Sequence, residues 1–222
     1  MRNFEWIYQH ALERKGDREA LEALLPLPIS ADELVSKPDS YFLSAMTWRI
    51  FCAGLNRKMI DNKWPAFEEV FFGFDPQKLV LMSDEMLENT LQDTRLVRHW
   101  GKIKSIRTNA AMLLELGREK GGFGRFIAEW PEDRIVDLWL LLAKQGAQLG
   151  GNSGAYFLRI VEKDTFILTN DVVAALKAQK IVDKKPASKR DLNAVQEAFN
   201  AWHRQSDRPL CQISQLLSFC AN

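Results

Sequence analysis

The sequence contains little cysteine and little histidine. The three residues of each type are Cys52, Cys211, Cys220, His10, His99 and His203. The number of cysteines is odd, no Cys-x-x-Cys spacing occurs, and the histidines are too scattered to suggest a metal site. A disulfide framework and a Cys/His metal centre are therefore not predicted, and a reduced, cytoplasmic interior is the expected environment.

The chain also lacks long apolar runs and an excess of charge of either sign. No apolar run reaches the length of a membrane-spanning helix, and residues 1–5 do not resemble a signal peptide. The 30 Lys and Arg residues nearly balance the 29 Asp and Glu residues, so the net charge alone does not indicate a nucleic-acid partner. With 46% hydrophobic residues, the 222-residue chain can form one large domain or two small lobes.

Patterns typical of β-strands are nearly absent. Residues 165–168 are the only short candidate, and an extended connector is an equal alternative. Helical periodicity and caps predict helices over residues 11–25, 41–55, 65–72, 76–82, 100–118, 136–148, 155–161, 170–179, 188–203 and 209–219. Ser83 is predicted to cap a further helix. The fold class predicted from this pattern is all-α.

Positive charge is concentrated in two segments. Residues 95–107 contain no acid and hold the bases Arg95, Arg98, Lys102, Lys104 and Arg107. Residues 177–190 contain one acid, Asp183, and hold the bases Lys177, Lys180, Lys184, Lys185, Lys189 and Arg190. Such segments can contact phosphates, and Lys102 is one predicted contact. Solvated helix faces, with Lys102 as a surface lysine, are the alternative.

A glycine-rich turn, Leu149-Gly150-Gly151-Asn152-Ser153-Gly154, separates two apolar segments of helix length. Glycines let a backbone turn sharply and approach another surface closely. A helix N-terminus after such a turn offers N–H groups to a phosphate, and Asn152 and Ser153 can add side-chain hydrogen bonds. We therefore predict a helix-hairpin-helix motif in which these six residues bind DNA. An ordinary turn between two helices is the alternative.

One block of the sequence resembles the DNA-3-methyladenine glycosylase I family. The resemblance is carried by Phe74-Asp75-Pro76, Gln92-Asp93, Val97-Arg98-His99-Trp100-Gly101-Lys102-Ile103 and Asn109-Ala110, in that order. Weaker similarity extends it to roughly residues 41–180. It implies a two-lobed, all-α glycosylase that excises alkylated purines from double-stranded DNA during base excision repair.

The chain departs from that family at three places. Family members carry zinc ligands at the two ends of the domain, whereas this chain has no N-terminal Cys and no His near Asp171, so we expect no metal and no cofactor. The family's base-contacting Glu falls on Arg49, and its stacking Trp falls on Arg57. Arg49 cannot accept a hydrogen bond from an adenine amino group, because a guanidinium has donors only.

Asp171 is the candidate catalytic residue. In the wider helix-hairpin-helix superfamily an Asp stands on the helix after the hairpin, and Thr169-Asn170-Asp171-Val172-Val173 is similar to that pattern. Cleavage of an N-glycosidic bond builds oxocarbenium-like charge on the sugar, which a carboxylate can stabilise. Members with lyase activity carry a Lys where this chain has Tyr156, so a monofunctional enzyme is expected. An exposed first-turn acid is the alternative for Asp171.

A flipped base requires an aromatic pocket, and the chain has seven tryptophans. Trp48 and Arg49 are predicted to line this pocket, together with Trp6 and Tyr8 near the N-terminus. An electron-deficient alkylpurine would stack favourably on an indole ring. The alternative is that these rings belong to the hydrophobic core, and that Arg49 pairs with an acid.

The sequence predicts one glycosylase-like unit over residues 1–222. Its approximate lobes are a helical lobe at 41–130 and a second at 131–180 that holds the hairpin and Asp171, with 1–40 and 181–222 packed around them. We expect a monomer that binds damaged duplex DNA. The alternatives are a DNA-binding relative without turnover and a helical protein-interaction domain.

Overall fold

The computed structural model describes residues Met1–Ala221, and these residues form helices and no strand. The predicted all-α class is therefore confirmed. The chain divides into two compact units. The terminal unit contains residues 1–29, 131–138 and the segment from Glu162 onward. The central unit contains residues 30–130 and 139–161.

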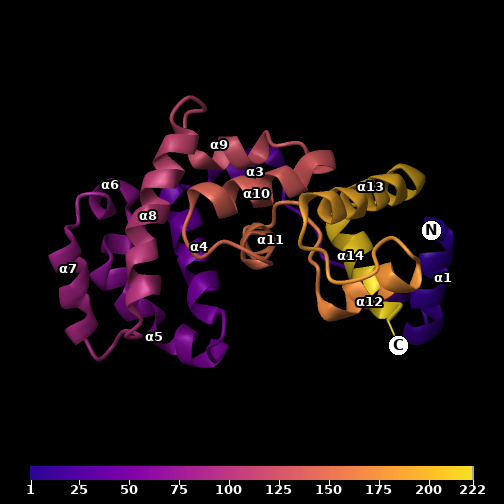
Figure 1. The fold of residues 1–222 in the computed structure, drawn as a ribbon, viewed down its shortest axis with the longest axis horizontal. Helices are drawn as coiled ribbons and strands as arrows, with labels where there is room; N and C mark the ends of the chain where they lie inside the picture. The colour runs from indigo at the N-terminus through magenta and orange to yellow at the C-terminus, as the bar shows by residue number, and fades with distance from the viewer. Residues whose placement is uncertain (222) are drawn as a thin grey trace. The chain divides into compact units, whose positions relative to one another are not determined.

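The central unit is built around α4, which packs against α5, α8, α9 and α11. Figure 1 shows α4 and α8 side by side. The elements of this unit are α3 (Ala31–Ser36), α4 (Asp39–Cys52), α5 (Arg57–Val70), η1 (Phe72–Phe74), α6 (Pro76–Leu79), α7 (Asp84–Asn89), η2 (Thr90–Gln92), α8 (Trp100–Gly117), α9 (Phe123–Ala128) and α11 (Ser153–Ile160). Helix α10 (Ile135–Gln145) begins in the terminal unit and continues in the central unit.

Aromatic rings fill the interior of the central unit. Phe51 and Phe67 meet edge to face with ring centroids 4.7 Å apart. Trp64 stacks on Phe67 at 5.1 Å and on Phe74 at 5.3 Å. Each such pair contributes about 0.5–1.5 kcal/mol beyond the burial of its surface. This cluster holds α4, α5 and η1 together, and it thereby positions the side chains on the outer faces of α4 and α5.

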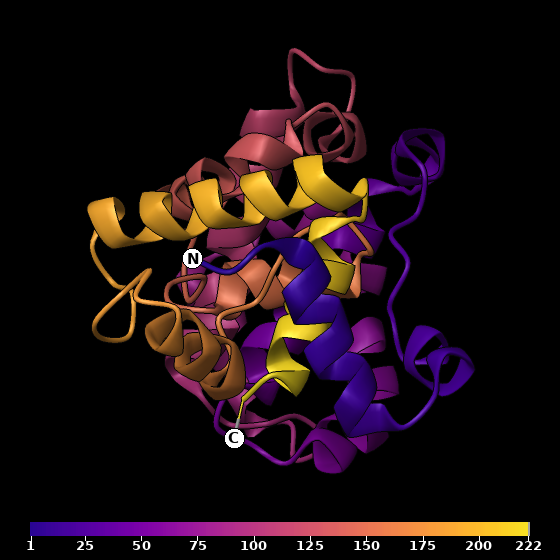
Figure 2. The same ribbon diagram turned by 90° about the vertical axis from the view of Figure 1, so that its right-hand side faces the viewer.

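The terminal unit joins the two ends of the chain. Helix α14 (Leu210–Phe219) packs against α1 (Phe4–Lys15), α12 (Asn170–Ala178) and α13 (Lys189–Ser206). Figure 2 shows α1 beside α14. The unit also contains α2 (Arg18–Ala23) and η3 (Glu132–Arg134). In its core Phe166 stacks on Phe199 at 4.1 Å, and Trp202 meets Phe199 edge-on.

The helix predicted over 11–25 is wrong. Two helices, α1 and α2, occupy residues 4–23, with a break at Gly16, where φ is 91°. Such a conformation ends a helix most easily at glycine. Asp17 then starts α2, because its carboxylate accepts the N–H of Ala20 at 2.8 Å.

The helix predicted over 65–72 begins eight residues too late. Asn56 caps α5 through the N–H of Met59, and the helix runs through Pro65 to Val70. Pro65 lies at an exposed position inside the helix. A proline there removes one backbone donor, and burial of Ile60 and Phe67 on the opposite face outweighs that loss.

Several other predicted boundaries are confirmed. Ser83 caps α7 and Ser188 caps α13. The long basic helix runs over Trp100–Gly117, and Pro209 stands at the N-cap of the last helix. Residues 165–168 form an extended connector rather than a strand.

The lobes predicted at 41–130 and 131–180 do not coincide with the two units. The hairpin falls in the central unit with residues 30–130, whereas Asp171 falls in the terminal unit. Each unit is formed by segments that are separate in the sequence, so a single boundary along the chain cannot divide the two units. No helix in residues 1–221 is both long and apolar enough to cross a membrane.

Candidate nucleic-acid interface

The glycine-rich turn connects two helices that approach each other closely. Gly154 is buried in the first turn of α11. A side chain there would meet the carbonyl oxygen of Leu149 at 3.3 Å and the backbone of Trp139 at 3.9 Å. The last glycine of the motif therefore serves helix packing. The helix-turn-helix geometry expected of a hairpin is present in the central unit.

The start of the turn is fixed by a buried asparagine of α8. Asn109 Oδ1 accepts the N–H of Ala147 at 2.8 Å, and its Nδ2 donates to the carbonyl of the same residue at 3.1 Å. Gly146 packs beside it, since a Cβ there would lie 2.9 Å from Asn109 Oδ1 and 2.7 Å from Leu149 Cδ1. Sequence reasoning missed this function of Asn109 and Gly146. The Asn109-Ala110 pair inside the family-like block was the available signal.

The outer part of the turn faces open space. A Cβ built on Gly150 or Gly151 would meet no atom within 4 Å, and Gly151 has φ 59°. The side chain of Asn152 does not cap α11. An exposed backbone with small residues can be approached closely by another molecule. The predicted DNA contact of residues 149–154 stays a prediction that this geometry allows.

Lys102 has a different place from the one predicted. Only 7% of this residue is exposed, and its Nζ donates to the carbonyl oxygens of Ala53 at 2.6 Å and Phe51 at 3.3 Å. These carbonyls lie at the C-terminal end of α4, where a cation is favourable. Lys102 thus caps a helix inside the central unit, and this position argues against a phosphate contact.

Trp48 lines a cavity of about 500 Å³ in the central unit. Its walls are formed by Tyr41, Ser44, Ala45, Trp48, Arg57, Asp61, Trp64 and Ile160. The indole nitrogen of Trp64 donates to Ser44 Oγ at 3.3 Å. Aromatic faces with a few polar groups are typical of ligand sites. The role of Trp48 in a base pocket stays a prediction that this volume and aromatic lining allow.

A small polar network stands at the rim of this cavity. The indole nitrogen of Trp48 donates to Asp61 Oδ1 at 2.8 Å, and Arg57 Nε lies 3.8 Å from Asp61 Oδ2. The guanidinium of Arg57 lies over the Trp48 ring, 4.9 Å from its centroid. The side chain of Arg57 is 76% exposed, so it covers Trp48 from the solvent side without being fixed there.

Arg49, the other predicted pocket residue of α4, is not among the residues that line this cavity. Its guanidinium carbon lies 4.4 Å from the centroid of the Tyr156 ring, on α11. The Nε atom is buried and has no hydrogen-bond partner in residues 1–221. A shielded donor without an acceptor costs about 1–3 kcal/mol. The alternative pairing of Arg49 with an acid is not found in the part of the chain that the structure describes.

Trp6 and Tyr8, the other predicted pocket residues, lie in the terminal unit. Trp6 is 37% exposed and stacks on His10 at 4.8 Å. The Tyr8 hydroxyl donates to Glu22 Oε1 at 2.8 Å, and Arg208 lies 5.3 Å from its ring centroid. Tyr8 is therefore engaged in a side-chain network of its own unit, which argues against a base-stacking role.

Asp171 lies in the first turn of α12, after the N-cap Thr169. It is exposed, and no hydrogen bond or ion pair holds its carboxylate within residues 1–221. The nearest acid before it in the chain, Asp164, is differently placed. Asp164 accepts the N–H groups of Leu210 and Cys211, both at 2.8 Å, and so caps α14. Of these two acids, Asp171 is the one free to meet a substrate.

The two basic segments differ in their partners. In residues 95–107, Arg107 and Lys104 pair with Asp84, and Arg95 pairs with Asp93 and Glu69. Hydrogen bonding from Arg107 lowers the pKa of Asp84.

In residues 177–190, none of the six bases forms an ion pair within the described chain. The six lysine and arginine side chains of this segment are exposed and can contact phosphates. Of the two predicted basic segments, only this one thus retains its full charge.

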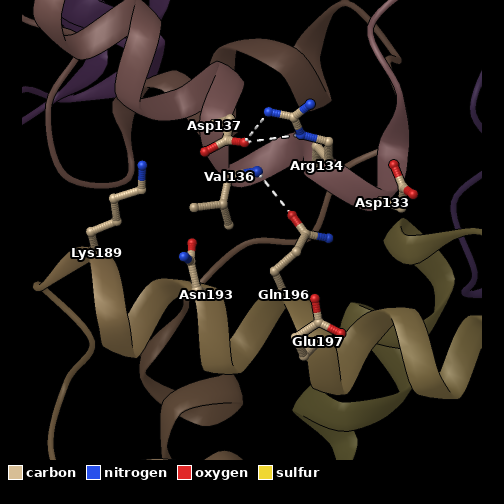
Figure 3. A pocket seen from close by; sticks show the side chains of 8 residues that line it. All are labelled: Asp133, Arg134, Val136, Asp137, Lys189, Asn193, Gln196 and Glu197. Carbon is tan, nitrogen blue, oxygen red and sulfur yellow. Dashed lines mark hydrogen bonds and ion pairs between the residues drawn. The ribbon is translucent and has the colours of Figure 1, made fainter.

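A second cavity, of about 260 Å³, lies in the terminal unit beside α13 (Figure 3). Figure 3 shows its lining residues, which are Asp133, Arg134, Val136, Asp137, Lys189, Asn193, Gln196 and Glu197. Gln196 Oε1 accepts the N–H of Val136 at 2.9 Å, and its Nε2 donates to Asn200 Oδ1 at 2.9 Å. These buried groups bind each other and join α13 to the start of α10. The buried polar side chains at this cavity therefore serve helix packing, and we assign them no ligand.

The cysteines do not form a zinc-binding donor set. Cys211 Sγ lies 3.6 Å from the carbonyl oxygen of Pro26, and Cys220 Sγ lies 3.5 Å from that of Ile7. Burial raises the pKa of Cys220 to about 11, which disfavours the thiolate that zinc requires. No group of three or more potential metal ligands occurs among residues 1–221. The residues present do not fit the zinc site that the resemblance implies.

The family model described as methyladenine glycosylase matches residues 35–145, half of the chain. The chain belongs to this family. Over 75 residues it is 33% identical to DNA-3-methyladenine glycosylase 1 of Escherichia coli and 31% identical to the DNA-3-methyladenine glycosylase of Haemophilus influenzae. These 75 residues cover 34% of this chain and 40% of each relative, so the chain spans less than half the length of the curated relatives it matches.

Solved structures share the fold over a larger part of the chain. A 3-methyladenine DNA glycosylase I has a TM-score of 0.50 and 22% identity, over 65% of this chain and 86% of its own. The 8-oxoguanine glycosylase/lyase of Methanocaldococcus jannaschii, solved with 15mer DNA containing 8-oxoguanine, has a TM-score of 0.52 and 13% identity, over 96% of both chains. The chain therefore shares the fold of these DNA glycosylases, over 96% of its length in the second comparison.

Proposed function

We propose that this protein is a monofunctional DNA glycosylase that hydrolyses the N-glycosidic bond of alkylated bases in duplex DNA. The observation that carries the proposal is the membership of residues 35–145 in the methyladenine glycosylase family. The relatives named above are DNA-3-methyladenine glycosylases. The exposed turn at Gly150 and Gly151, which leaves room for a DNA strand, and the cavity beside Trp48, which leaves room for a base, support the proposal.

In the proposed reaction Asp171 acts on the sugar of the flipped nucleotide. Its carboxylate stabilises the positive charge that grows at C1′ as the bond to the base lengthens, and it orients the attacking water. An alkylated base leaves readily because its ring carries a positive charge. Tyr156 supplies no amine, so no Schiff base forms and lyase activity is absent.

The proposed substrate is double-stranded DNA. The lysine and arginine side chains of residues 177–190, which form no ion pair within the described chain, add affinity that depends on salt. We propose that the enzyme acts as a monomer in the cytoplasm, without a metal. The thiols of Cys52 and Cys220, which form no disulfide among the described residues, agree with a reducing compartment.

Release of free base from methylated duplex DNA, identified by chromatography, tests the proposal. We expect Asp171→Asn to lower the rate at least about tenfold, at the low end of effects for a positioned carboxylate. Asp207→Asn is the matched control, because Asp207 is also an exposed acid of the terminal unit and lies outside the basic segment 177–190. Equal rates for wild type and Asp171→Asn would remove Asp171 from the mechanism.

Binding without excision is the second candidate function. It is favoured by the two arginines that lie on aromatic faces at the site, Arg49 on Tyr156 and Arg57 on Trp48. A protein of this kind would bind duplex or lesion DNA and release no base. Release of even one modified base would exclude it.

A further inference from the structure

One donor of Arg49, the Nε atom, finds no acceptor among the described residues. This atom is shielded from solvent. The Tyr156 ring covers one face of the guanidinium, so the N–H groups project from its edge. A planar fork of donors, held by stacking, fits a ligand that presents acceptor atoms.

A ligand that is itself a cation or a hydrogen-bond donor is disfavoured beside Arg49, because positive charge is already present there. Lys102 lies close enough that, with burial as the larger cause, Arg49 lowers its pKa. Lys102 is itself tied to the carbonyls of Ala53 and Phe51. A ligand that hydrogen-bonds to Arg49 must therefore be a hydrogen-bond acceptor.

Arg49, on α4, stacks on Tyr156 of α11, the helix that leads from the hairpin turn to the aromatic cavity. Helices α4 and α11 pack against each other. Tyr156, under Arg49, is in the first turn of α11, and Ile160, one turn later, lines the cavity with Trp48. A nucleotide held at the turn and directed into the cavity would pass this guanidinium.

Two parts of DNA present acceptors, namely the phosphates and the edges of the bases. Phosphates of a duplex are met by exposed, flexible cations such as those of residues 177–190. The shielded Nε of Arg49 requires an acceptor that enters the protein, and the extruded base is the part of the DNA that does so. The geometry therefore favours the base.

We propose that Arg49, seated on Tyr156, is a specificity-determining residue that reads the carbonyl oxygen at C6 of the flipped base. A 6-oxopurine presents this acceptor, whereas a 6-aminopurine presents a donor that a guanidinium repels. The substrate class is therefore alkylated guanine in preference to alkylated adenine. This inference rests on the proposed glycosylase function.

Duplex DNA treated with a methylating agent contains 7-methylguanine and 3-methyladenine in one substrate. Both lesions are cationic in DNA, so both are good leaving groups. They differ at C6, at C2 and in the methylated nitrogen, and the change of their release ratio in an Arg49 variant reports on the group at C6. We expect wild type to release 7-methylguanine about tenfold faster per lesion than 3-methyladenine. Arg49→Gln is expected to remove this preference by slowing 7-methylguanine release about tenfold, with less than a twofold change for 3-methyladenine.

Two further variants separate the role of the fork from charge and folding. Arg49→Lys keeps the charge but loses the planar pair of donors, so we expect it to behave as Arg49→Gln does. Arg118→Gln removes an exposed arginine of the same unit, one that pairs with Glu115, and should keep the wild-type ratio. Circular dichroism melts verify that each variant is folded.

Three results would overturn the inference while leaving the glycosylase function intact. The first is a wild-type preference for 3-methyladenine. The second is an unchanged ratio of the two bases in Arg49→Gln. The third is an equal loss for both bases together with weaker binding of undamaged duplex, which would make Arg49 a phosphate contact.

If wild type releases no base, the proposed function fails, and the binding of free bases then decides the inference. Quenching of tryptophan fluorescence by free 7-methylguanine and free 3-methyladenine measures this binding. If wild type binds 7-methylguanine more tightly than 3-methyladenine, and Arg49→Gln loses this difference, the result supports a contact between Arg49 and the oxygen at C6. Equal binding, or no binding, overturns it.

Discussion

At the scale of single residues, Tyr8, Glu22 and Arg208 form a network that gives the terminal unit a pH dependence. Arg208 Nη2 donates to Glu22 Oε1 at 2.6 Å, and this contact, with a smaller contribution from Tyr8, lowers the pKa of Glu22 below its ordinary value of 4.5. A carboxyl whose pKa is lower in the folded state stabilises the fold above its unfolded pKa. That stabilisation is lost as the pH falls through the folded pKa.

We therefore expect Glu22→Gln to reduce stability at pH 7 and to flatten its decline on acidification. The difference in melting temperature between the variant and wild type should shrink as the pH falls from 7 to below 4. Glu19→Gln is the control, because Glu19 is exposed on the same helix. A difference that stays constant over this range would show that the network contributes no linked protons.

Single residues are also where prediction from sequence is hardest. Trp48 lines an aromatic cavity, whereas Tyr8 contacts Glu22 and Arg208. Residue type indicates which chemistry is available but not which partner is nearest. Lys102 shows this best, because a lysine in a basic segment proves to be buried against carbonyls of a distant helix.

At the scale of elements, the hairpin separates glycines needed for packing from glycines that leave the surface open. A Cβ on Gly146 would lie 2.7 Å from Leu149 Cδ1 and 2.8 Å from the Leu142 carbonyl oxygen, whereas one on Gly150 would meet nothing. We expect Gly146→Ala to lower the free energy of unfolding by about 1–3 kcal/mol, because the backbone must shift to make room. Urea denaturation measures this change.

Gly150→Ala is the matched variant. We expect its free energy of unfolding to stay within about 0.5 kcal/mol of wild type. Under the proposed function it weakens binding of duplex DNA, since the added methyl stands where the strand approaches. Equal stability losses in both variants, or unchanged DNA binding in Gly150→Ala, would contradict this division of roles.

The elements themselves were largely predictable. Caps such as Ser83 and Ser188 act through neighbouring backbone groups, so their effect is readable from local sequence. The start of α5 is not predicted correctly, because a proline such as Pro65 is typical of a first helical turn, whereas the actual N-cap is Asn56. The function of Asn109 escaped notice because its partner, Ala147, is distant in the chain.

At the scale of the whole molecule, the two basic segments should contribute differently to DNA affinity. Each cation that neutralises a phosphate adds about 0.9 to the slope of log affinity against log salt. We expect the combined change of Lys180, Lys184 and Lys185 to Gln to reduce this slope by about 2–3. Fluorescence anisotropy of a labelled duplex, titrated from low to high salt, measures it.

Lys104→Gln is the control for that titration. Lys104 lies 3.7 Å from Asp84, so its charge is already balanced within the protein. Its removal should leave the slope unchanged. A larger change for Lys104→Gln than for the three lysines together would place the DNA on the central unit's basic helix instead.

The sequence by itself determined the all-α class, most helix boundaries, the hairpin and the family, because periodicity, caps and motifs depend on residues close together in the chain. Only the tertiary structure decided which basic side chains form ion pairs, which aspartate caps a helix and that the buried Nε of Arg49 has no acceptor among the described residues. Asp164 and Asp171 are alike in sequence, yet backbone groups of α14 engage the first and not the second. Such differences depend on contacts between distant segments, which local sequence does not encode.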